Sequence, residues 1–249
     1  MSHIPVLRIG QCGTQGLDSS GRAPIEDDVN DPSQFPYGIV ANGVAKTFSV
    51  VPAALQTNNI VTSAIVNGAA TLTAGTGVTA TTINGVPVLD ITGGAYERAI
   101  QIVGTAGGVS AVSFTVVGFD MYNQPMTCTF NGPAATATTV SQKTFRYISS
   151  ITSAATTTAA VTIGTADTFG FPARVDTWDQ CLVFWGDALI TATTGFTAAD
   201  ATNPATATTG SVRGRYATQS ASNGTRRLRM IVWLDNPQNM NTAYGIRQA

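Results

Sequence analysis

The sequence predicts an all-β protein, with a β-sandwich or jelly-roll-like body and an extended N-terminal arm. Threonine makes up about one residue in seven of the 249, alongside abundant Val, Ala and Gly, and Thr and Val fit the pleated surface of a strand. Lys, Glu and Leu, which favour exposed helices, are scarce. Short β-type runs recur with turn dipeptides between them and no helices, which favours a sandwich or barrel.

The first 45 residues differ from the rest of the chain. They contain four prolines, several glycines and the acidic cluster Glu26, Asp27 and Asp28, and they show no helical or alternating period. We expect residues 1–45 to form an extended arm, which either wraps around a neighbouring subunit or is disordered. Fully extended, this arm would reach about 150 Å.

Residues 46–235 are predicted to form the body. Dipeptides such as Asn84-Gly85 separate its β-type runs and supply the positive φ values that tight turns need. The clearest hairpin is Ala111–Phe130, in which apolar and polar residues alternate before and after a turn. The predicted strands are Lys46–Val51, Asn59–Val66, Ala99–Val103, Ser110–Phe119, Met126–Phe130, Thr144–Ile151, Ala160–Ile163, Cys181–Trp185 and Arg227–Leu234.

The arrangement of the later strands follows from their order. We expect Ala111–Ile163 to form one antiparallel sheet. Residues 191–210 are Thr/Ala-rich and are expected to form a long exposed loop or an excursion between strands. After this loop, Ser211–Tyr216 and Arg226–Asp235 are expected to pair as a closing hairpin, and residues 236–249 are expected to form a polar tail.

The sequence predicts no catalytic residue, no cofactor site and no metal site, and we expect the chain not to be an enzyme. His3 is the only histidine, which argues against histidine acid–base chemistry and multi-histidine metal sites. Cys12, Cys128 and Cys181 are odd in number and lack C-x-x-C spacing, so buried thiols are expected.

Trp178 and Trp185 lie close in sequence to four carboxylates, and two interpretations are open. An aromatic, acidic cleft could bind or cleave a sugar. Alternatively, the carboxylates end strands and the tryptophans fill a core or an interface, which we favour because nothing in the spacing selects a catalytic pair. The carboxylates are Asp167, Asp176, Asp179 and Asp187.

Five arginines form the only basic concentration. If the two predicted strands of the closing hairpin pair, Arg213 and Arg215 share one face, as do Arg227 and Arg229. The patch is predicted to dock on an acidic partner, such as the arm of a neighbouring copy; the alternative is a solvated strand face. The candidate partner-binding residues are Arg213, Arg215, Arg226, Arg227, Arg229, Trp178, Trp185, Glu26, Asp27 and Asp28.

Three segments resemble small virion proteins of tailed phages. Val116–Thr127 is similar to their V-x-G-x-D-x-x-G-x-P hairpin, Lys143–Ile151 to their K-x-F-K-x-I-x-S-I strand, and Ile163–Val175 to their V-G-x-x-D-x-x-G-L-P-x-R-V segment. The resemblance covers about Ala99–Val175. It implies a head cement (decoration) protein or another minor virion component, with a β-sandwich or jelly-roll domain that binds outside the shell and bridges capsomers of the major capsid protein.

We therefore expect a structural virion protein that binds the outer surface of a phage capsid and clamps neighbouring major capsid subunits, itself as a dimer or trimer. The N-terminus lacks a secretory signal and no apolar run reaches the roughly 18 residues of a membrane span. Synthesis in the host cytoplasm is expected, with no membrane partner. A net charge of −1 argues against nucleic acid as a partner. The alternatives are a neck, tail or baseplate component and a glycan-binding surface protein.

Overall fold

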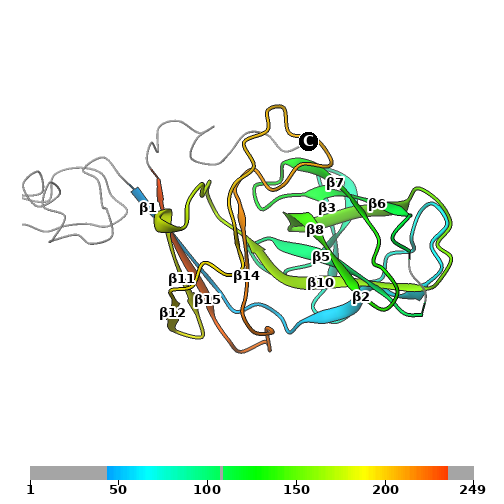
Figure 1. Ribbon diagram of the computed structural model, residues 1–249, viewed down its shortest axis with the longest axis horizontal. Coiled ribbons are helices and arrows are strands. Elements are labelled where there is room, and N and C mark those ends of the chain that lie inside the picture. The colour runs from blue at the N-terminus through cyan, green and yellow to red at the C-terminus, as the bar shows by residue number, and fades with distance from the viewer. Residues whose placement is uncertain (1–43, 107–108, 235–249) are drawn as a thin grey trace, which may run out of the picture.

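The computed structural model describes residues 44–106 and 109–234. Within them the regular structure is antiparallel strands and one 3-10 turn, η1 (Trp178–Gln180), so the all-β prediction is confirmed. The body is β-sandwich-like and contains three sheets, which we name A, B and C (Figure 1). The predicted arm up to residue 43, with Glu26, Asp27 and Asp28, and the predicted tail 236–249 lie outside the described residues.

Sheet C contains the predicted hairpin. Its strand order is β3-β4-β9-β6-β7, and buried and partly exposed residues alternate in β6 and β7 because one face packs on a core. The pairing of β6 with β7 confirms the hairpin over Ala111–Phe130. Asn84 and Gly85 form the β3–β4 turn with φ values of 51° and 81°, as this dipeptide predicts. The strands are β3 (Thr79–Ile83), β4 (Val86–Asp90), β6 (Ser113–Phe119), β7 (Pro125–Asn131) and β9 (Tyr147–Ser153).

Sheet B is built around its long strand β10. The strand order is β13-β14-β10-β5-β8, and β2 also pairs with β10. Along β10 the partner changes: its first half pairs with β2, and Thr168–Gly170 pairs with β14. The strands are β2 (Gln56–Ala64), β5 (Arg98–Gly104), β8 (Thr138–Phe145), β10 (Val161–Gly170), β13 (Phe196–Thr197) and β14 (Arg215–Ala217).

The prediction that Ala111–Ile163 form one sheet is wrong. β9 belongs to sheet C and β10 to sheet B, so the connection at 154–160 carries the chain from one sheet to the other. Ile151 and Val161 then pack in the same core from two sheets. An alternating pattern shows which face of a strand is buried, but it does not show which sheet the strand joins.

The larger hydrophobic core lies between sheets B and C. Its largest members are aromatic and β-branched side chains with little or no exposed surface, and each contributes about 1.5–3 kcal/mol by burial. They include Phe114, Phe130, Phe145, Ile100, Ile102, Ile151 and Ile163.

Sheet A forms the other end of the body, on the left in Figure 1, with strand order β1-β15-β11-β12. The predicted closing hairpin of Ser211–Tyr216 and Arg226–Asp235 is wrong, because β14 pairs in sheet B whereas β15 lies between β1 and β11. Tyr216 and Leu228 still share one core. The strands are β1 (Val44–Val50), β11 (Cys181–Trp185), β12 (Ala188–Ile190) and β15 (Leu228–Leu234).

A smaller core fills the space between sheet A and the second half of β10. It includes Phe169, Trp185, Tyr216 and Met230, and the Phe169 and Trp185 ring centroids are 6.5 Å apart. β10 therefore supplies both cores, with Ile163 in the larger one and Phe169 in the smaller one.

The Thr/Ala-rich segment 191–210 is attached to the sheets. It contains β13, and the main-chain N–H of Thr129 donates to Ala207 O at 2.7 Å. Lys143 Nζ donates to Thr206 O at 2.9 Å, and burial lowers the pKa of this lysine. The segment is therefore part of the folded body, although many of its residues are exposed as predicted.

Candidate interaction surface on sheet A

Two central strands of sheet A are apolar on both faces. All five residues of β11 are apolar, and Arg229 is the only polar residue of β15. A strand with one solvated face alternates apolar and polar residues, so an unbroken apolar run indicates that both faces are suited to burial. Val183 and Met230 pack into the smaller core on the inner face. The outer face of the two strands packs into neither core.

The strand register shows which side chains share the outer face. Residues directly opposite each other in antiparallel strands point to the same side. Leu182 pairs with Ile231, and Phe184 pairs with both Arg229 and Leu189. Leu189 is 43% exposed, and the other apolar members are partly exposed and belong to neither core. The apolar residues of the outer face are Leu182, Phe184, Leu189, Ile231 and Trp233.

Charged groups lie at one end of this face. The Arg229 guanidinium lies 4.7 Å from the Phe184 ring centroid and its Nη2 is 3.7 Å from Asp187 Oδ1. Arg226 lies 5.5 Å from the Trp185 ring centroid, and Arg227 is exposed. Arg226, Arg227 and Arg229 thus lie close together at this end of the sheet. An apolar centre with a charged rim is typical of protein–protein interfaces.

The three tryptophans have different positions. Trp185 is buried in the smaller core and its Nε1 donates to Ser220 Oγ at 2.9 Å. Trp178 packs on the same core, 5.8 Å from the Tyr216 ring centroid. Trp233, which was not among the predicted residues, lies on the outer face, and its Nε1 has no hydrogen-bond partner among the described residues. This nitrogen is also buried, although the Trp233 side chain as a whole is partly exposed.

The prediction of a surface patch at Arg213 and Arg215 is wrong. Arg213 is only 2% exposed, and its guanidinium pairs with Glu97 and, at 2.9 Å, with Asp120. Arg215 donates to the main-chain oxygen of Ser141. Arg213 therefore binds the loop that precedes β14 to the sheets, and Arg215 binds the start of β14 to β8. Neither forms a patch with Arg226, Arg227 and Arg229.

Glu97 is the centre of this buried ion cluster. Besides Arg213, it accepts from Thr144 Oγ1 at 2.7 Å and from the Met121 N–H at 2.9 Å. Burial raises the pKa of Glu97, although Arg213 acts to lower it. Because all these donors are internal, the carboxylate joins β5, β8 and the turn after β6 to the segment before β14.

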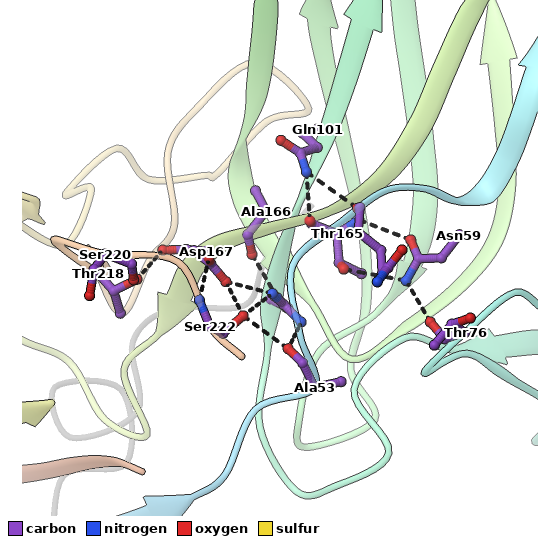
Figure 2. Close-up of polar contacts among 12 residues, drawn as sticks. Ala53, Asn59, Thr76, Gln101, Thr165, Ala166, Asp167, Thr218, Ser220 and Ser222 are labelled. Carbon is purple, nitrogen blue, oxygen red and sulfur yellow. Dashed lines mark hydrogen bonds and ion pairs between the residues drawn. The ribbon is translucent and has the colours of Figure 1, made fainter. Parts of the chain in front are cut away.

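Arg98 fills a second polar junction; Figure 2 labels its partners Ala53, Ala166, Asp167 and Ser222. Next to it, β10 departs from the β5 register, since Ile100 pairs with Thr165 and Arg98 pairs with Phe169. Arg98 Nε donates to Ala166 O at 2.7 Å and Nη2 pairs with Asp167 at 2.5 Å. Further hydrogen bonds run from the guanidinium to Ala53 O and to Ser222 Oγ. Arg98 thereby donates to one main-chain oxygen in the irregular stretch of β10, Ala166 O, and to one between β1 and β2, Ala53 O.

The carboxylates near the tryptophans mostly have cationic partners. Asp167 pairs with Arg98, and Asp187 lies near Arg229. Asp176 Oδ1 accepts from Arg174 at 2.7 Å. Within residues 44–106 and 109–234, no group of three His, Cys, Asp or Glu side chains could hold a metal ion. The same part of the chain contains no helix that is long and apolar enough to span a membrane.

Two features were missed by the sequence analysis. The outer face of sheet A is signalled by the unbroken apolar runs of β11 and β15, which were interpreted only as strands. The cluster of Glu97, Asp120 and Arg213 has no local signal, because Arg213 is 116 residues from Glu97 and 93 from Asp120.

Comparison with known proteins does not assign the chain to a group. No protein-family model matches it, and neither a curated protein nor a solved structure shows significant similarity to it.

Proposed function

We propose that this chain is a non-enzymatic structural protein of a tailed-phage particle, which binds the outer surface of the capsid and clamps neighbouring major capsid subunits. The observation that carries the proposal is the outer face of sheet A. Large apolar side chains gathered on one exposed sheet face mark a protein-contact surface. The resemblance of Val116–Thr127, Lys143–Ile151 and Ile163–Val175 to small virion proteins supports the particle as the location.

The contact chemistry follows from the residues of this face. Phe184 and Trp233 provide large, rigid apolar area, and aromatic residues and arginine are enriched in interfaces. Arg229 lies over Phe184 and can set the register of a partner without being fully desolvated. The threonine-rich remainder of the surface adds contact at low cost, because a hydroxyl is cheaper to desolvate than a charge.

The proposed place of action is the virion, after synthesis in the host cytoplasm. The partners are the major capsid protein and further copies of the chain, with neither nucleic acid nor membrane involved. A neck, tail or baseplate component is the second candidate, since it would use the same kind of contact surface. The two differ in copy number, because a cement protein covers the whole shell whereas a neck or tail component forms one ring or a few.

The test compares two substitutions on particles of the phage that encodes this chain. Leu189→Asp places a charge on the outer face, and Val86→Asp places it at an equally exposed site on sheet C, since the two residues are 43% and 41% exposed. Quantitative mass spectrometry of purified particles gives copies per major capsid protein. We expect many copies of the wild type and of Val86→Asp, and few of Leu189→Asp.

Two results would overturn the proposal. If the wild-type chain is absent from purified particles, the virion location is wrong. If Leu189→Asp has normal occupancy while its circular dichroism matches the wild type, the outer face is not the contact surface. A low copy number at one vertex would favour the neck or tail candidate.

A further inference from the structure

We propose that the outer face of sheet A binds the same face of a second copy of this chain, which gives a dimer with two-fold symmetry. This inference rests on the proposed function in taking that face as a protein-contact surface. A second copy occupies the face, and the capsid is then contacted by the outward surfaces of the dimer. A dimer presents each of these surfaces twice, so one small protein can clamp two neighbours.

The size of the face is sufficient for a weak dimer. Sheet A has four strands, and β1 and β15 each have seven residues. With strands about 4.8 Å apart and a rise of about 3.3 Å per residue, the face measures about 19 Å by 23 Å. Two such faces packed about 10 Å apart interdigitate their side chains. The two faces together would bury about 900 Å², which is below the roughly 1,200 Å² at the lower end of standard specific interfaces and fits a weak dimer.

The charges of the face are self-complementary. Arg229 on β15 and Asp187 in the β11–β12 turn lie at the same end of sheet A, on opposite sides of β11. In a two-fold contact, a residue on one side of the axis meets a residue on the other side. An axis that runs parallel to β11 therefore places Arg229 of one copy against Asp187 of the other.

The existing contact between these two groups leaves both available. Within one chain they are 3.7 Å apart, and the side chains are 40% and 78% exposed. The same axis would pass over Leu182 and Phe184, so that each packs against its own counterpart. A partner with charge of one sign would match only one of Arg229 and Asp187, whereas a second copy matches both.

The first experiment is the mass of the purified full-length chain in solution. At about 50 μM, above the micromolar dissociation expected for an interface of this size, light scattering should give twice the chain mass of 25.7 kDa. Leu182→Asp should give the monomer mass, because Leu182 lies on the proposed axis and two introduced carboxylates would then meet, and Val86→Asp should remain dimeric. Circular dichroism of both variants should match the wild type. A monomeric wild type, or a folded and dimeric Leu182→Asp, would overturn the proposal.

A charge exchange tests the proposed orientation. Arg229→Asp and Asp187→Arg should each weaken the dimer about tenfold, or about 1.4 kcal/mol, because like charges then meet across the axis. An equimolar mixture of the two variants should recover the dimer, since every contact across the axis again joins opposite charges. The pair within each chain is not restored in the mixture, so recovery reports the contact between copies.

The outcomes of the mixing experiment are distinct. A mixture that stays as weak as the single variants would show that the two faces do not meet in this way.

The solution mass requires no virus particle, so a monomeric chain would refute the dimer without bearing on capsid binding. Absence from purified particles would refute the virion location while leaving the dimer standing.

Discussion

Replacing Arg213 with Met should destabilise the folded protein by about 3–5 kcal/mol, the usual cost of removing one partner from a buried ion pair. Arg213 is almost completely buried between Glu97 and Asp120. Methionine keeps much of the side-chain volume. The lost free energy of unfolding should therefore come mainly from two buried carboxylates without a cationic partner, and less from a cavity. Domains are typically stable by about 5–15 kcal/mol, so this variant should lose at least a fifth of its stability.

The pH dependence of this deficit separates charge from packing. Burial already raises the pKa of Glu97, and Arg213 is the largest influence that lowers it. Without Arg213 the folded-state pKa rises further above the unfolded value, so the folded variant binds a proton more tightly than the unfolded chain. Its stability therefore improves relative to the wild type as the pH falls from 7 to 5.

Urea unfolding, followed by tryptophan fluorescence at pH 5 and pH 7, gives the loss of stability and its dependence on pH. The matched control is Arg227→Met, which changes an exposed arginine and should shift stability by less than about 0.5 kcal/mol. A cost below about 1 kcal/mol for Arg213→Met at pH 7 would contradict the stabilising role of the buried ion pair. An equal deficit at pH 5 and pH 7 would contradict the role of the Glu97 charge.

Two further predictions concern packing and a buried thiol. Gly118→Ala should lower the free energy of unfolding in urea by about 1–3 kcal/mol or more, because a Cβ there would lie 2.0 Å from Tyr147 O. The control is Gly85→Asn, which has open space and a φ of 81° and should cost less than about 1 kcal/mol. Equal losses for the two variants would contradict the close approach at Gly118. Burial raises the pKa of Cys181 from 9.0 to about 12. The unfolded thiol ionises first, so stability should fall by about 1.4 kcal/mol per pH unit between pH 9 and about 12. Cys181→Ala should lose this part of the slope, and an unchanged slope in unfolding curves would refute it.

The local elements could be predicted from the sequence because their signals are local. The β6–β7 hairpin has alternating residues and a turn within twenty residues, and Asn84-Gly85 specifies the β3–β4 turn by its backbone preference. Buried positions such as Phe114 and Val116 follow from the same alternation.

The assembly of these elements was harder to predict. The partners of β15 are β1, at the start of the described chain, and β11, so the neighbouring segment Ser211–Tyr216 was a misleading choice. Arg213 looked like a surface charge because nothing near it in sequence shows that Glu97 is buried beside it. The sequence shows the apolar runs of β11 and β15. Whether their outer face is exposed depends on whether another sheet packs against it, and the sequence does not show this.

β10 passes through both hydrophobic centres, and this ties the stability of one half of the body to the other. Ile163 and Phe169 are only six positions apart, yet they anchor separate packing layers. Between them the register of β10 with β5 shifts and Arg98 Nε donates to Ala166 O, so inserting or deleting a single residue would break this junction and change the spacing of the two side chains. Insertions and deletions that the surface loops can accommodate should therefore destabilise the protein when they fall in this stretch. Cutting the chain there would leave two fragments, each with an incomplete hydrophobic core.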